Sequence, residues 1–85
     1  MMPLDGNAIA GTLEDLFGHD MTAGEATCAH CGRSGFVAEM VVYKGGPGIV
    51  GRCRSCDNVS LVITERRGMY CADFTGLSRL TSPLT

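Results

Sequence analysis

Apolar residues recur near the N-terminus with the period of an α-helix, and we predict one helix over residues 4–18. One face of this helix carries four apolar residues at the spacing i, i+4, i+7 and i+8, namely Ile9, Leu13, Leu16 and Phe17. Asp5 or Asn7 is suited to cap its start, and Gly18 to end it in the left-handed region. The apolar face has two possible uses: it packs on a sheet, or it docks into the groove of a partner protein.

The pattern changes after residue 27 to short runs of β-branched and aromatic residues that alternate with turn signals. These runs predict strands over residues 36–43, 49–53, 59–65 and 69–75, with a turn at 44–48 and a hairpin tip at 66–68. We expect a linker over 19–27, with a short strand before Cys28, and a tail over 76–85 that packs briefly and then frays. The whole chain, residues 1–85, then forms a single small α+β domain, with antiparallel hairpins over 28–75.

A chain of 85 residues without tryptophan buries little apolar surface, so its fold needs a further source of stability. Five cysteines are an odd number, which fits a set of disulfides badly. No apolar run has the length of a membrane span, and the N-terminus lacks the pattern of an export signal. We therefore expect a cytoplasmic protein, whose cysteines stay reduced.

Four of the cysteines form two Cys-x-x-Cys pairs, Cys28 with Cys31 and Cys53 with Cys56, and 21 residues separate the pairs. Two intervening residues let one tight turn aim both sulfurs at the same ion, and zinc prefers four such thiolates in a tetrahedron. Gly32 follows the first pair and Asp57 the second, at positions where the chain must leave the turn through the left-handed region. The sequence therefore predicts one structural Zn²⁺ ion held by all four side chains, as in a zinc ribbon with two Cys-x-x-Cys knuckles.

Iron is the alternative metal, because the same paired cysteines also occur in rubredoxin-like electron-transfer proteins. With either metal, its removal is expected to unfold residues 28–75. Cys71, the fifth cysteine, is expected to be a buried and inert thiol in a strand. The methionines Met21, Met40 and Met69 are expected to fill gaps in the small core.

Charge is distributed unevenly along the chain, with a net −5 over residues 1–27 and +3 over residues 28–85. Arginines flank both cysteine pairs and the last hairpin tip: Arg33, Arg52, Arg54, Arg66 and Arg67. Those beside the cysteines either offset the charge of the thiolates or contact phosphates. Arg66 and Arg67 could form a basic and aromatic face for single-stranded nucleic acid, although the acidic N-terminal third disfavours this. The other members of this face would be Lys44, Arg52, Tyr43 and Tyr70.

The sequence resembles a family of short bacterial proteins of unknown function. The resemblance rests on the opening LDGNAIAGTLEDLFG and on the segments CAHCG and CRSC, and it covers roughly residues 4–77. It implies a zinc ribbon with an N-terminal helix, and it implies no known activity.

We expect this protein to be a non-enzymatic module for protein interaction or regulation. The sequence contains no recognisable catalytic set and no phosphate-binding glycine loop, and no small-molecule substrate is evident. A partner protein is expected, but the sequence does not identify it, and no membrane partner is indicated. The alternatives are a nucleic-acid-binding or transcription-associated zinc ribbon and a rubredoxin-like electron carrier.

Overall fold

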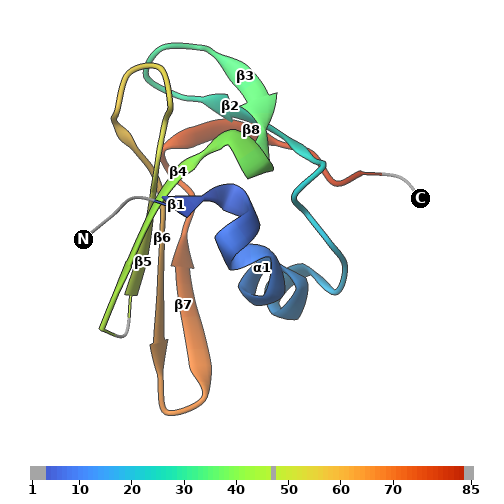
Figure 1. Ribbon diagram of the computed structural model, residues 1–85, viewed down its shortest axis with the longest axis vertical. Coiled ribbons are helices and arrows are strands. Elements are labelled where there is room, and N and C mark those ends of the chain that lie inside the picture. Colours follow the sequence, from blue (N-terminus) through green and yellow to red (C-terminus); the bar gives the residue numbers. More distant parts are fainter. Residues whose placement is uncertain (1–3, 47, 84–85) are drawn as a thin grey trace.

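The computed structural model describes residues 4–46 and 48–83, which form one helix and two antiparallel sheets (Figure 1). The chain begins with a short strand, β1 (Leu4–Asp5), and a 3₁₀ turn, η1 (Gly6–Ile9), before the helix α1 (Ala10–Phe17). The helix is therefore shorter than the predicted span. Asp5 accepts the backbone N–H of Asn7 at 3.0 Å and caps the 3₁₀ turn, while Gly18 ends α1 with φ 84°.

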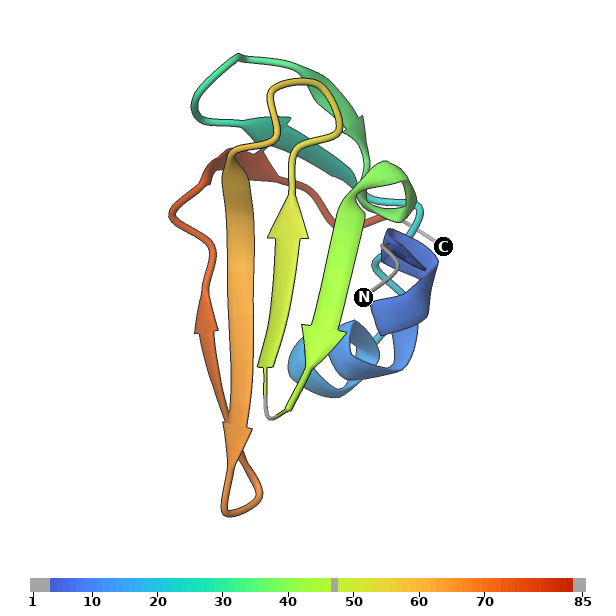
Figure 2. The same cartoon turned by 60° about the vertical axis from the view of Figure 1, so that its left-hand side comes forward.

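The larger sheet has the strand order β1-β4-β5-β6-β7. Its long members are β4 (Val41–Gly45), β5 (Gly48–Arg52), β6 (Val59–Arg66) and β7 (Met69–Asp73). All neighbouring strands are antiparallel, and Figure 2 shows β7 outside β6, at the edge of the sheet far from β4. The hairpins predicted over residues 49–75 are thus present.

The strand predicted over residues 36–43 is broken into two elements in different sheets. Residues Ser34–Phe36 form β3, Val37–Glu39 form a 3₁₀ turn, η2, and β4 begins only at Val41. The break has a local cause, because the Glu39 carboxylate accepts the backbone N–H of Phe36 at 3.0 Å and Met40 donates its N–H to the Val37 carbonyl. These bonds close a turn where the side-chain pattern suggests a continuous strand.

The smaller sheet has the order β3-β2-β8 and joins segments far apart in the sequence. Its central strand β2 (Glu25–Cys28) runs from the end of the predicted linker, where a short strand was expected, through Cys28. Strand β8 (Leu77–Leu80) lies within the predicted tail. Leu80 pairs with Ala26 and Leu77 with Cys28, so this part of the tail is a strand of the sheet. Residues 84–85, where fraying was expected, lie outside the described residues.

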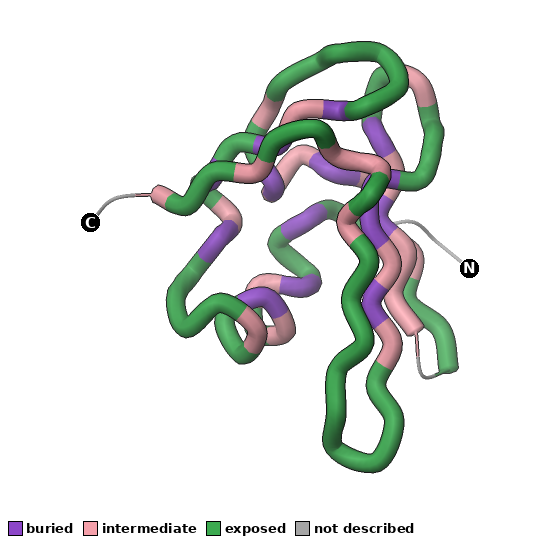
Figure 3. Tube along the Cα trace, turned by 180° about the vertical axis from the view of Figure 1, so that it is seen from behind, coloured by how far each residue is buried: buried purple, intermediate pink, exposed green. Residues whose placement is uncertain are grey.

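The core lies between α1, η2 and the inner face of the larger sheet. Its members are fully shielded apolar side chains from both halves of the chain: Ile9, Leu13, Met21, Ala26, Val37, Met40, Val42, Leu61 and Ile63. Two residues expected in the core lie outside it, because Cys71 is exposed and Met69 is 73% exposed. Both belong to the edge strand β7, whose five residues are all exposed, and Figure 3 shows this hairpin projecting from the rest of the chain.

Candidate metal centre

The sulfur atoms of Cys28, Cys31, Cys53 and Cys56 all lie within 4.8 Å of one another. Two of the distances are shorter, 3.6 Å between Cys28 Sγ and Cys56 Sγ and 3.7 Å between Cys31 Sγ and Cys53 Sγ. A regular tetrahedron of sulfurs about 2.3 Å from a central zinc ion has edges of about 3.8 Å. The four cysteines therefore have the spacing that a single metal ion requires.

Two turns with the same backbone geometry supply these sulfurs, and we call residues 28–33 the first cysteine turn and residues 53–58 the second. In the first, Gly32 donates its N–H to the Cys28 carbonyl at 3.0 Å; in the second, Asp57 donates to the Cys53 carbonyl at 2.9 Å. Gly32 has φ 77° and Asp57 has φ 63°, so both turns are left through the left-handed region, as the sequence predicts.

The ends of strands bring the two turns together. Cys28 is the last residue of β2, and the second cysteine turn joins the end of β5 to the start of β6. Both turns lie at the same end of the molecule, at the top of Figure 1. Cys28 and Cys53, the first cysteine of each turn, are buried, whereas Cys31 is exposed.

Donor groups surround the sulfurs in a matching way. The backbone N–H of His30 points to Cys28 Sγ, and the backbone N–H of Ser55 points to Cys53 Sγ, each at 3.4 Å. The side-chain amide of Asn58 donates to Cys56 Sγ, also at 3.4 Å. Such bonds favour the thiolate, which is the form that binds a metal. Sequence reasoning missed the role of Asn58, although its place two residues after Cys56 was visible.

Without a metal ion, the thiols of Cys31 and Cys56 differ strongly in pKa. The backbone N–H and side-chain amide of Asn58 lower the pKa of Cys56 to about 6. At Cys31 the backbone N–H of Arg33 lowers the pKa, but desolvation and the neighbouring sulfurs outweigh it and raise this pKa to about 11. The Cys31 thiol thus keeps its proton at neutral pH when no cation is near, and a bound metal ion would replace that proton.

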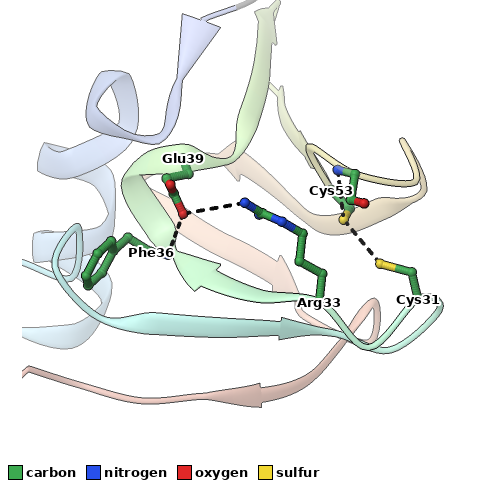
Figure 4. Close-up of polar contacts among 6 residues, drawn as sticks. Cys31, Arg33, Phe36, Glu39 and Cys53 are labelled. Carbon is green, nitrogen blue, oxygen red and sulfur yellow. Dashed lines mark hydrogen bonds and ion pairs between the residues drawn. The ribbon is translucent and has the colours of Figure 1, made fainter.

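Arg33 is turned away from the sulfurs. Its guanidinium lies 4.0 Å from the Glu39 carboxylate, the same group that accepts the Phe36 N–H. Figure 4 shows this side chain pointing toward Glu39, with Cys31 and Cys53 on the other side. Arg33 is therefore used in an ion pair with η2 and does not lie over the thiolates.

The other arginines are spread over the molecule. Arg52 stacks on Tyr43, 6.0 Å from the ring centre, and donates to the Asp57 carbonyl at 2.9 Å. Arg54 is exposed in the second cysteine turn, whereas Arg66 and Arg67 lie at the opposite end of β6, at the β6–β7 tip. The strand register also places Tyr43 and Tyr70 on opposite faces of the sheet. The predicted basic and aromatic residues thus do not form one continuous surface.

The apolar face of the helix is built into the core. Ile9 and Leu13 are buried, and Leu16 packs against the core cluster. Phe17 is 36% exposed and meets Phe74 with a distance of 5.8 Å between ring centres. In this arrangement, most of the predicted interaction face is occupied by the protein's own sheet.

The sequence comparison adds the family. A family model described as a family of unknown function, DUF6510, matches residues 1–85. The chain belongs to this family. Neither the curated proteins nor the solved structures give a match to the chain. Within the described part of the DUF6510 chain, no helix has both the length and the apolar composition that a membrane crossing needs.

Proposed function

We propose that this DUF6510 protein is a non-enzymatic module whose fold is held by one structural zinc ion and which acts through contacts with a partner protein. The observation that carries the zinc site is the group of four cysteine sulfurs within 4.8 Å of one another. Four protein thiolates fill a tetrahedral zinc site and leave no position for water or substrate. A closed site of this kind supports a structural role for the metal and argues against catalysis.

Zinc and iron both accept four thiolates, so the donor set alone leaves the metal open. We favour zinc, because the site joins two sheets of a very small protein and thereby serves the fold without any need for redox chemistry. Iron would make the protein a rubredoxin-like electron carrier. We expect the purified protein to be colourless and to hold one zinc ion per chain when it is expressed in medium containing both metals.

Element analysis by mass spectrometry tests this directly, with Cys71→Ser as the matched control. The Cys71 side chain lies outside the group of four, so this variant should keep one zinc ion per chain, whereas Cys53→Ser should lose it. A red-brown protein with iron as its main metal would instead indicate an electron carrier. Equal metal content in both variants would contradict the assignment of the four cysteines as the metal site.

The proposed partner is a protein, because the acidic N-terminal third presents carboxylates to solvent. The apolar side of α1 faces the core, while Glu14 is exposed to solvent and Asp15, also exposed, accepts the Tyr70 hydroxyl at 3.1 Å. Deleting residues 1–27 would remove Ile9 and Leu13 from the core, so a point variant is the better test. Glu14→Lys should reduce the recovery of a copurifying partner while Glu14→Gln largely retains it, and unchanged recovery with Glu14→Lys would rule out this surface.

Nucleic-acid binding is the less favoured function, since the arginines that suggested it lie at opposite ends of β6. Binding through phosphates falls steeply with salt. A titration with short single-stranded and double-stranded oligonucleotides at low salt therefore decides it, and we expect no saturable binding. We also propose a cytoplasmic location, in keeping with reduced cysteines.

A further inference from the structure

Strand β7 presents an unprotected edge of the larger sheet. Every one of its five residues, MYCAD from Met69 to Asp73, is exposed, and in the described part of the chain no further strand follows it in the sheet order. The opposite edge strand, β1, has only two residues. The longest unpaired row of backbone donors and acceptors at an edge of this sheet therefore belongs to β7.

Natural edge strands usually carry features that prevent pairing with other chains, such as lysine, proline, a bulge or an inward-pointing charge. β7 contains no lysine, arginine or proline, and its register with β6 runs from Arg66↔Met69 to Val62↔Asp73 without a bulge. Its only charged side chain, Asp73, is at the very end and accepts bonds from the backbone and hydroxyl groups of Thr75. The strand thus lacks the usual protection.

The hairpin turn determines which backbone groups face outward. Arg67 and Gly68 both have positive φ, 54° and 77°, in the two-residue turn between β6 and β7. In such a turn the N–H of the residue after it bonds back to the residue before it, and the pairs then alternate along the ladder. The N–H and C=O groups of Met69, Cys71 and Asp73 therefore point to β6, and those of Tyr70 and Ala72 point outward.

We propose that two copies of this chain pair antiparallel through β7, about a two-fold axis at Cys71. Tyr70 of each copy then exchanges two backbone hydrogen bonds with Ala72 of the other, which uses every outward-facing group of the strand. Cys71 meets its own counterpart in a pair without backbone hydrogen bonds, where Cα atoms are about 4.5 Å apart. The two larger sheets become one continuous sheet with both α1 helices on the same side.

In this register β7 is complementary to itself. We therefore take the partner of β7 to be a second copy of the chain. The large Tyr70 side chain lies opposite the small Ala72, and the acidic Asp73 lies opposite the neutral Met69, so no like charges oppose each other. Tyr70 is also held in place, since its hydroxyl donates to the Asp15 carboxylate at 3.1 Å. Met69, 73% exposed in the single chain, becomes covered along the joined edge.

Sedimentation velocity on the metal-loaded 85-residue protein over a concentration series tests the dimer, with two variants at one position. Ala72→Pro removes an outward N–H from each copy without touching the β6–β7 ladder, and Ala72→Ser keeps that N–H. We expect Ala72→Pro to raise the dimer dissociation constant at least about tenfold, from two lost hydrogen bonds, and Ala72→Ser to change it little. A wild-type monomer at every concentration, or equal dimerisation of all three proteins, would overturn the proposal.

The register is tested by cross-linking in a Cys71→Ser background. With a short bis-maleimide reagent, the variant Met69→Cys should not link to itself, and neither should Asp73→Cys, but a mixture of the two should link across the dimer. Peptide mapping identifies the linked cysteines, and a link of either variant only to itself would show another register. Metal content is measured on every sample, so a loss of the zinc site would be recognised separately from a loss of the dimer.

Discussion

The two cysteine turns have the same backbone geometry but different residues around their cysteines. Comparing them shows which features a four-cysteine metal site requires and which can vary. The two turns are closed by equivalent bonds: Cys28 N–H donates to the Arg33 carbonyl at 2.9 Å, and Cys53 N–H donates to the Asn58 carbonyl at 2.9 Å. The residue with positive φ is Gly32 in one turn and Asp57 in the other. The geometry of the sulfurs is thus fixed by backbone bonds, and the side chains around them are free to differ.

The largest effect is expected from removing one cysteine of either turn, which tests whether both turns are required for metal binding. Cys28→Ser and Cys53→Ser each remove a buried sulfur at equivalent positions, so both should abolish metal binding and unfold residues 28–75. Circular dichroism and the dispersion of NMR amide signals report the unfolding, and metal analysis reports the loss of the ion. Cys71→Ser is the control. Native β-structure that persists after complete chelation would show that the core alone holds the fold.

The next effect concerns the donors around the sulfurs, where the turns differ. Asn58 donates a side-chain amide to Cys56 Sγ, whereas Arg33, at the same position of the first turn, points to Glu39. Removing a bond to a ligand typically costs 10–100-fold in metal affinity. Asn58→Ala should therefore weaken metal binding about tenfold or more in competition with a chromogenic chelator. Arg33→Ala should leave the affinity unchanged, and an equal loss in both variants would contradict this reading.

The two residues with positive φ should respond differently to substitution. Gly32→Ala places a side chain in the left-handed region and should destabilise the metal-loaded protein by about 1–2 kcal/mol. Space does not limit this substitution, since a Cβ at Gly32 would meet no atom within 4 Å. Asp57→Gly relieves similar strain but adds about 0.5–1 kcal/mol of unfolded-state entropy, so its net effect should be near zero. Urea unfolding measures both, and equal losses would refute strain as the cause.

The cluster of four cysteines and the last hairpins were predictable from the sequence because local chemistry specifies them. Two residues between cysteines define a turn, and the run from Val59 to Arg66 followed by Arg67 and Gly68 defines a hairpin. The pairing of β2 with β8 was not predictable in this way, because it joins residues about 50 positions apart and depends on tertiary packing. Neither strand has an alternating pattern long enough to reveal its partner.

Other errors arise where a side chain or the order of strands decides the outcome. The Glu39 carboxylate takes the Phe36 N–H and breaks a run that otherwise has strand character. Cys71 lies in a correctly predicted strand, yet periodicity does not say that this strand is at the edge, and so its exposure was missed. For the same reason, helical periodicity identified the apolar face of α1 but did not decide between the core and a partner.

The smallest expected effects come from removing the arginine contacts that stabilise the two turns. Arg52 donates to the Asp57 carbonyl inside the second turn at 2.9 Å, whereas the Arg33–Glu39 pair is 4.0 Å apart and both of its side chains are more than one third exposed. Exposed ion pairs contribute about 0–1 kcal/mol and weaken with salt. Arg33→Gln should therefore lower stability by less than about 0.5 kcal/mol at physiological salt. Arg52→Gln should cost about 1 kcal/mol, because it removes a hydrogen bond to the backbone that shapes the metal site. Urea midpoints at low and high salt separate the two, since only the Arg33 effect should shrink with salt. A larger cost at Arg33 than at Arg52 would contradict this order and would mean that the contact with η2 supports the site more than the contact within the second turn does.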